Sequence, residues 1–428
     1  MRILFLTQVL PFPLDAGPKI RAYYVLRYLC QHHEVTLASF VRPTDTAEAI
    51  AHLQQFCRDV HTVAMPRSKL LDVVHMLKSL VTTQPFIIAR DWMPTMVHLL
   101  QDLIARTHFD AIHADQLWMA PYALWARQAV ERREETGERR QERGNAQMRP
   151  LTVLDQHNAV YLIPKRLAEH ERNPLKRALL ALEARKLARF EMGACRQFDR
   201  VAWVSNEDYA ALQRRLPNNA APVPKTAMIP ICVNPQDEPA IVRQSAGRRV
   251  TFLGGLHWPP NAEGIQWFVQ EVWPQVHAQA PDAILTVIGK HPPAALQEGA
   301  VPNLQITGYV DDPAPFLAET AAFIVPLHAG GGMRVKILDA WAWGLPIVST
   351  TTGAEGIDIC PGENILIADS ATEFAQALIH LLKDSAQATV IAQAGRAWVE
   401  RRYNWRIIYP AWDRIYSWQT ITASAISE

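Results

Sequence analysis

The sequence predicts an α/β protein of two domains, each built on a parallel sheet covered by helices. Apolar runs of strand length alternate with helix-like segments in both halves of the chain, an order typical of βαβ units. The 428 residues exceed what one hydrophobic core usually holds. Six prolines fall between Leu216 and Gln244, which favours a junction between domains there. We therefore expect a first domain over 1–225 and a second over 226–402.

The apolar runs define the expected strands of each sheet in turn. Strand-length runs bounded by polar or turn-forming residues are read as strands, and longer mixed segments such as Ile20–Cys30 as helices. The first half predicts the strands Ile3–Leu6, Val35–Phe40, Ala111–His113, Thr152–Asp155 and Val201–Val204. The second half predicts the strands Val250–Leu253, Ile284–Ile288, Leu304–Thr307, Ala322–Pro326, Ile347–Ser349 and Ile365–Ile367.

Composition excludes several classes of function. The chain has 43 basic and 42 acidic residues, so nothing indicates a nucleic-acid partner. Its five cysteines show no metal-ligand spacing and fit no complete disulfide framework, which favours a reducing, cytoplasmic location. The apolar stretch Arg2–Leu10 is cut by Pro11 and Pro13, as expected of a first strand rather than a signal peptide. No run approaches the roughly 18 apolar residues of a membrane span.

Residues 173–191 are expected to form a basic amphipathic helix. Leucines recur at loosely helical spacing among several lysines and arginines. A helix that packs on the core is the first interpretation. Peripheral contact with the anionic inner membrane surface is the alternative.

The turns that follow strands are the places to look for chemistry, because parallel sheets bind ligands beyond the carboxyl ends of their strands. The segment His328–Gly344 follows a predicted strand, is rich in glycine and is expected to open a helix near Gly331. Glycines let backbone amides approach a phosphate, and a helix amino terminus favours an anion. With that helix start, one face carries Gly332, Lys336, Asp339 and Trp343. Arg334 and Lys336 would neutralise a diphosphate, and Asp339 would accept hydrogen bonds from ribose hydroxyls.

Two further turns carry candidate residues. Asp15–Arg21 places Gly17 at a junction of strand and helix, but it lacks the GxGxxG pattern of dinucleotide cofactors. Asp155–Asn158 follows an apolar strand, and its His157 could contact or deprotonate a substrate hydroxyl. The alternative is that His157 caps a helix or satisfies a buried partner. For His113 we expect a structural role.

An ordered series of motifs in the second half resembles the retaining family 4 glycosyltransferases of GT-B fold, especially those of polysaccharide assembly. The likeness covers most of the chain. The matching motifs are Phe252–Gly254, Pro259–Asn261, Trp267–Pro274, Val287–Gly289, Gly308–Asp312, Pro326–Leu327, Gly330–Gly332, Lys336–Ala340 and Gly344–Val348.

The resemblance implies two Rossmann-like domains that face each other across a cleft. The second would bind an NDP-sugar co-substrate, and the first a glycan, lipid-linked or small-molecule acceptor, with retention of anomeric configuration and no cofactor or metal. A carboxy-terminal helix over 403–421 would cross back to the first domain. The implied site residues are catalytic His157, Arg334 and Lys336; nucleotide-sugar-binding Gly17, Tyr309, Val310, Gly331, Gly332, Met333 and Asp339; and acceptor-side Arg21 and Asn158.

The sequence departs from the family pattern in the second domain. Gly331 and Asp339 stand where the family often has two glutamates. The usual Arg and Lys after the first strand of this domain are absent from Gly254–Trp258, so Arg334 and Lys336 are expected to supply that charge. Two alternatives stay open: a nucleotide-sugar 2-epimerase of the same architecture, and a non-catalytic member that binds NDP-sugar.

Overall fold

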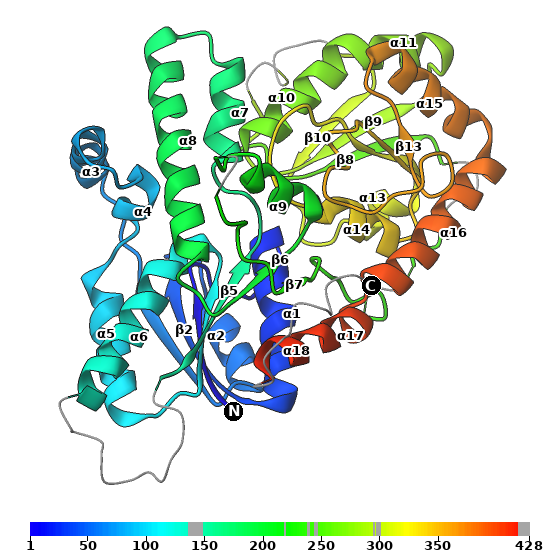
Figure 1. Cartoon of the computed structure of the whole chain (residues 1–428). Helices are drawn as coiled ribbons and strands as arrows, with labels where there is room; N and C mark the ends of the chain where they lie inside the picture. Colours follow the sequence, from blue (N-terminus) through cyan, green and yellow to red (C-terminus); the bar gives the residue numbers. More distant parts are fainter. Residues whose placement is uncertain are drawn as a thin grey trace.

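The computed structural model describes residues 1–135, 149–217, 220–237, 240–243, 247–293, 296 and 301–417. It contains two parallel sheets surrounded by helices (Figure 1). The first sheet has seven strands in the order β3-β2-β1-β4-β5-β6-β7, and the second has six in the order β10-β9-β8-β11-β12-β13. The predicted class, two parallel-sheet α/β domains, is confirmed.

The first domain contains the five predicted strands and two more at the sheet's edges. Edge strand β3 was missed because it is only partly buried and its apolar run is broken, and β7 has two residues. The strands are β1 (Arg2–Thr7), β2 (Glu34–Val41), β3 (Asp59–Ala64), β4 (Ala111–Asp115), β5 (Leu151–Gln156), β6 (Arg200–Trp203) and β7 (Ala227–Met228). The helices are α1 (Gly17–His32), α2 (Ala47–Gln54), α3 (Lys69–Val81), α4 (Phe86–Arg90), α5 (Pro94–Arg106), η1 (Leu117–Met119), α6 (Ala120–Glu135), α7 (Leu162–His170), α8 (Pro174–Cys195) and α9 (Asn206–Gln213).

The second domain contains all six predicted strands. They are β8 (Arg249–Leu253), β9 (Ile284–Ile288), β10 (Leu304–Gly308), β11 (Thr320–Val325), β12 (Ile347–Ser349) and β13 (Leu366–Ile367). The helices of the second half are α10 (Pro259–Trp267), η2 (Phe268–Val272), α11 (Trp273–Gln279), α13 (Ala314–Ala318), α14 (Val335–Ala342), α15 (Ala371–Lys383), α16 (Ser385–Arg402), α17 (Trp405–Ile408), η3 (Tyr409–Ala411) and α18 (Trp412–Tyr416).

The start of α14 differs from the prediction. The helix begins at Val335 rather than near Gly331, because Gly330 (φ +121°) and Gly332 (φ +74°) adopt positive backbone angles that end regular structure there. Gly332 therefore lies in a loop, and Trp343 is the helix cap. Of the predicted face, only Lys336 and Asp339 lie within the helix.

The chain passes between the domains twice, at one place. A linking segment, Ile229–Val233, leads from β7 toward β8, and the chain returns through α17, η3 and α18, which lie beside α1 in Figure 1. The two passages are hydrogen-bonded, because Val233 N donates to Tyr403 O (2.9 Å) and Trp405 N donates to Val233 O (3.2 Å). Tyr28 on α1 donates to Asp413 Oδ1 on α18 (2.9 Å). Residues 418–421 of the predicted helix lie outside the described residues.

Candidate functional site

Loops from the two domains meet where β1, β5 and β11 end. The glycine loop of the second domain, Gly330–Gly332, faces the residues that follow β5: a methyl group placed on Gly332 would lie 3.1 Å from Asn158 Cβ. A methyl group on Gly17, the first residue of α1, would lie 3.1 Å from Val335 Cγ2. The structure therefore brings together three segments that the sequence singled out separately.

Arg334 is held beneath the glycine loop by backbone contacts. Its Nη1 donates to the carbonyl oxygens of Gly331 and Gly332, both at 2.6 Å. The residue is 8% exposed, and burial lowers its pKa to about 10 despite the nearby Glu355 carboxylate. Its Nε and Nη2 are buried and have no partner among the described residues. These two N–H groups can donate to an anionic ligand.

Lys336 lies one turn further, over the end of β8. Its Nζ donates to Asn261 Oδ1 (2.9 Å) and lies 4.5 Å from the centre of the Phe252 ring. Gly254 lies close beneath it, because a methyl group there would lie 2.7 Å from Nζ and would displace the end of the lysine side chain. Burial, reinforced by the charge of Arg334, lowers the pKa of Lys336 to about 7, and Asp339 opposes this shift. An arriving anion would restore its charge.

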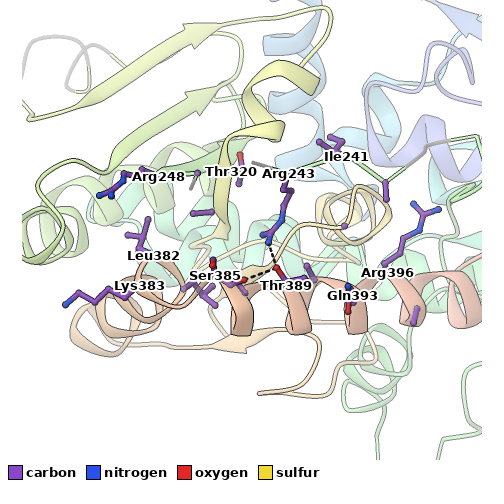
Figure 2. A pocket seen from close by; sticks show the side chains of 18 of the residues that line it. Ile241, Arg243, Arg248, Thr320, Leu382, Lys383, Ser385, Thr389, Gln393 and Arg396 are labelled. Atoms are coloured by element: carbon purple, nitrogen blue, oxygen red, sulfur yellow. Dashed lines mark hydrogen bonds between the residues drawn. The ribbon is translucent and has the colours of Figure 1, made fainter. Parts of the chain in front are cut away.

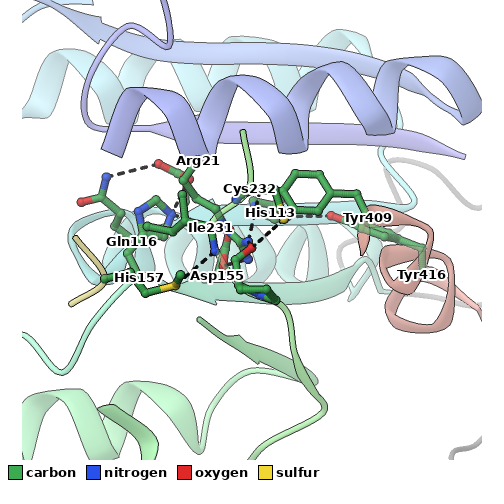
Figure 3. A network of polar contacts seen from close by, with 12 residues as sticks. Arg21, His113, Gln116, Asp155, His157, Ile231, Cys232, Tyr409 and Tyr416 are labelled. Atoms are coloured by element: carbon green, nitrogen blue, oxygen red, sulfur yellow. Dashed lines mark hydrogen bonds and ion pairs between the residues drawn. The ribbon is translucent and has the colours of Figure 1, made fainter. Parts of the chain in front are cut away.

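His157 belongs to a buried network of charges at the ends of β4 and β5 (Figure 3). Its Nε2 lies 2.9 Å from Asp115 Oδ1 and 3.5 Å from Asp155 Oδ2. Burial lowers the pKa of His157, but the two carboxylates outweigh it and raise the pKa to about 9. This pKa favours a protonated His157 at neutral pH, and a protonated imidazole donates hydrogen bonds from both ring nitrogens. Its buried Nδ1 has no partner among the described residues.

Arg21 does not reach the acceptor side as expected. Its side chain is fully buried and forms a bidentate ion pair with Asp155, with both distances 2.9 Å. It also donates to Pro230 O (2.5 Å) and Tyr409 OH (3.3 Å). An arginine in the interior needs such partners, because an unpaired buried charge is costly in free energy. Arg21 therefore positions Asp155 instead of touching a substrate.

His113, Asp115 and Asp155 offer ligand atoms that lie within 4.8 Å of one another. Both carboxylates are engaged by cations, Asp155 by Arg21 and Asp115 by His157. His113 stacks on Phe5, and burial lowers its pKa to about 3, as suits the structural role expected of it. The two carboxylates are thus satisfied by ion pairs, whereas the buried His113 Nε2 has no partner among the described residues. The sequence contains a signal for this pairing of charges that the sequence analysis did not use. Asp115 and Asp155 each end an apolar run, and the two runs form adjacent parallel strands.

Three predicted nucleotide-sugar residues lie apart from this centre. Tyr309 and Val310 follow edge strand β10, where the Tyr309 ring is 58% exposed and lies 4.0 Å from Lys290 Nζ. Met333 is buried, and its Sδ accepts from Ile231 N at 3.4 Å. Its side chain therefore packs on the linking segment instead of facing a ligand. Asp312 Oδ1 accepts from Ala314 N at the start of α13 (2.9 Å).

Two contacts near the candidate residues were not predicted from the sequence. Arg166 on α7 forms a bidentate ion pair with Glu355, in the loop after β12 (2.6 and 2.7 Å), and also donates to Gly330 O. Asn261 fixes Lys336. Neither residue type nor spacing identifies the partners in these two contacts, because the partners lie far apart in the sequence.

A cavity of about 650 Å³ lies elsewhere in the second domain (Figure 2). It is bounded by α15, α16 and the first residues of β11, including Thr320, Lys383 and Thr389. Arg243 crosses it to donate to Thr389 Oγ1 (3.1 Å). It lies at the amino ends of the strands, opposite to the end at which the predicted residues gather.

Among the described helices, none combines the length and the apolar character needed to traverse a lipid bilayer.

Comparison with known families places residues 247–384 in the family described as "Glycosyl transferases group 1". A mannosyltransferase of Corynebacterium glutamicum, named as GDP-mannose-dependent and acting on a monoacylated phosphatidylinositol monomannoside, is 29% identical over 148 residues, 32% of this chain and 39% of that protein. The chain matches less than half the length of the curated relatives. The second domain thus carries a glycosyl transferases group 1 region.

Solved structures match almost the whole chain. Sucrose-phosphate synthase from Thermosynechococcus elongatus has a TM-score of 0.65 at 17% identity, over 97% of this chain and 98% of that one. The Anabaena protein HepE in complex with UDP-glucose has a TM-score of 0.61 at 14% identity, over 97% of this chain and 99% of that one. These likenesses establish the GT-B fold.

Proposed function

We propose that the chain is a glycosyltransferase that moves a sugar from an NDP-sugar to an acceptor, with retention of anomeric configuration. One observation carries the proposal: the glycine loop of the second domain, with Arg334 and Lys336 behind it, abuts His157–Asn158 of the first. The family match over 247–384 supports sugar transfer. The GDP-mannose in the name of one relative and the UDP-glucose bound to one structural neighbour support a nucleotide-sugar donor.

The donor's diphosphate would lie over the glycine loop. Arg334 has two buried N–H groups to offer, and Lys336 gains a proton most easily next to an anion. Both would stabilise the negative charge that grows on the leaving diphosphate, a type of electrostatic stabilisation that is often the largest contribution to catalysis. Asp339 would hold the ribose, and Tyr309 and Val310 would lie near the base.

Transfer would take place on one face of the sugar. The bond from the anomeric carbon to the diphosphate oxygen breaks while a bond to the acceptor oxygen forms on the same face, and the acceptor's proton passes to the departing diphosphate. No covalent enzyme intermediate is needed. His157, protonated and held by Asp115, would donate from Nδ1 to a hydroxyl of the transferred sugar or of the acceptor.

The acceptor would bind to the first domain, beside Asn158. We propose a glycan, lipid-linked or small-molecule acceptor, with NDP-sugar as co-substrate and neither cofactor nor metal in the reaction.

A second candidate is a member that binds NDP-sugar without turning it over. It is motivated by Gly331, where the resembling family often has a glutamate; within 4 Å a methyl group there would meet only Ile163 and Leu162. The described side chains nearest that position therefore include no replacement acid.

Two measurements test the proposal together. The thermal midpoint of the wild type is measured with UDP, GDP, ADP and their sugars, because a ligand of the native state raises the midpoint. Release of NDP is then measured with and without acceptor extracts. A shift with one nucleotide class and acceptor-dependent release support transfer. A shift without release supports the binding-only candidate, and no shift with any nucleotide overturns both.

A further inference from the structure

Helix α3 displays an apolar surface to solvent. Eight large apolar residues of this helix are exposed, from 41% at Met76 to 86% at Val81, against six in all the other described residues. The eight are Leu70, Leu71, Val73, Val74, Met76, Leu77, Leu80 and Val81. A single exposed leucine is ordinary, but a contiguous apolar helix surface marks a site of interaction.

The orientation of α3 is the reverse of that expected for a helix on a globular protein. Its inward side is polar: Ser79 is buried, and Asp72 and His75 are half-buried. Lys186 on α8 holds this side by donating from Nζ to both Ser79 O and Ser79 Oγ. Surface helices normally bury their apolar stripe. In α3 the polar side is instead held against α8, and the apolar side faces solvent.

Two lysines flank the apolar stripe. At about 100° per residue, Leu70, Val74 and Leu77 lie at its centre, and Lys69 and Lys78 lie roughly a quarter-turn to either side. Long lysine side chains beside an apolar stripe can reach past it to charged groups while their methylenes stay in apolar surroundings. This arrangement suits a helix that lies in the plane of a membrane interface.

The neighbouring helix α8 adds positive charge. Figure 1 shows α3 beside α8, and the Lys186 contact confirms that they touch. Four basic residues of α8 are exposed, Lys176, Arg177, Arg185 and Arg189, of which Lys176 is paired with Glu171 and the three arginines carry the net positive charge. Of the acidic residues, Glu183 accepts from the backbone of Phe86 and Ile87, and Glu191 is buried. The surface formed by α3 and α8 is therefore apolar and cationic.

We propose that α3, with the basic residues of α8 beside it, docks this protein on the surface of an anionic phospholipid bilayer. The 13-residue helix is about 20 Å long, too short to cross a hydrocarbon core of roughly 30 Å, so it lies along the surface. Charge argues against a second copy of the chain as the occupant, because two such surfaces would oppose their lysines and arginines. The docking surface goes beyond the proposed function and does not depend on it. If sugar transfer also holds, the first domain would meet a lipid-linked acceptor at the membrane.

The test is vesicle flotation of the intact chain without nucleotide. Vesicles of phosphatidylcholine alone are compared with vesicles that also contain phosphatidylglycerol. The test variant is Leu70→Ser/Val74→Ser/Leu77→Ser. A matched control, Val242→Ser/Val390→Ser/Ile407→Ser, removes three equally exposed apolar side chains elsewhere. We expect the wild type and the control to float with anionic vesicles and the test variant to lose at least tenfold in bound fraction, with unchanged thermal midpoints.

Several outcomes overturn the proposal. They are failure of the wild type to bind anionic vesicles, binding by the test variant equal to that of the control, and equal binding to neutral and anionic vesicles. A wild-type dimer that the test variant dissociates, without vesicle binding, would assign the surface to self-association. Because flotation does not depend on catalysis, the test of membrane docking can be interpreted even if sugar transfer is not observed.

Discussion

Arg166 and Glu355 join the two domains by a bidentate ion pair, in which Nη1 and Nη2 each donate to a different carboxylate oxygen (2.6 and 2.7 Å). Arg166 lies on α7 and Glu355 in the loop after β12. Arg166 also donates to Gly330 O, so the pair fixes the edge of the glycine loop as well. This ion pair is therefore a direct contact between the two domains beside the glycine loop.

Removing the Arg166–Glu355 ion pair is expected to weaken the contact between the two domains without unfolding either domain. Arg166→Ala should lower the free energy of unfolding by about 1 kcal/mol, since both side chains are partly exposed, and should increase the radius of gyration in small-angle scattering. Lys165→Ala is the matched control, because Lys165 pairs with Glu169 within α7. Equal radii for the two variants would contradict a closing role.

Alanine should be tolerated at Gly331 and not at Gly332. At Gly332 the backbone has φ +74° and a methyl group would lie 3.1 Å from Asn158, whereas the nearest atom at Gly331 is 3.8 Å away. We expect Gly332→Ala to cost about 1–2 kcal/mol of stability and to weaken nucleotide binding. Thermal midpoints with and without nucleotide measure both effects. Similar losses in the two variants would argue against close approach of the glycine loop.

Binding of a nucleoside diphosphate should take up a proton at Lys336. Its pKa is about 7 in the free protein, and a diphosphate beside it raises that pKa. Affinity should therefore fall as pH rises above 7, by at most about tenfold per pH unit. Calorimetry in buffers of different ionisation enthalpy counts the proton. Lys336→Met should bind more weakly and without this uptake; an unchanged proton count would refute the assignment.

His157 should make stability depend on pH in a defined window. Its folded pKa of about 9 lies above the unfolded value near 6.5, so its contribution is fully present below pH 6.5 and is lost as pH rises through about 9. The contribution is about 3 kcal/mol at most. The difference in unfolding free energy between the wild type and His157→Gln, from denaturant titrations, should shrink from pH 6.5 to 9. A constant difference would mean that His157 is neutral.

Chelation should leave the protein unchanged. Arg21 and His157 already neutralise Asp155 and Asp115, so a metal ion would have to displace them. Addition of EDTA, Mg²⁺ or Mn²⁺ should shift neither the thermal midpoint nor NDP release. A rise in the midpoint with a divalent ion, lost in Asp115→Asn, would identify a cation site instead.

The sheets could be predicted from the sequence because central parallel strands are continuous apolar runs. Edge strands β3 and β7 escaped because solvent exposure and brevity remove that signal. The start of α14 was misplaced because Gly330 and Gly332 adopt positive backbone angles, which the spacing of residues does not report.

The sequence pattern located several candidate residues at strand ends but did not predict how they are arranged. Strand ends located His157, Arg334 and Lys336. Their partners were not predicted, because Asn261 lies 75 positions from Lys336 and Glu355 lies 189 positions from Arg166. The burial of Arg21 likewise follows from α1, the linking segment and η3 packing together, contacts that no local pattern encodes.

The two passages of the chain between the domains are hydrogen-bonded to each other and form a single connection. Val233 is hydrogen-bonded to Tyr403 and Trp405 of the returning chain, so any change in the angle between the domains would be expected to occur about this connection. The Arg166–Glu355 ion pair is a second contact between the domains. Arg21 lies at the connection that the two passages form. It donates to Pro230 O of one passage and to Tyr409 OH of the other, and it forms an ion pair with the Asp155 carboxylate beside His157. Through Arg21, a change in the angle between the domains would be expected to alter the contacts of the Asp155 carboxylate beside His157.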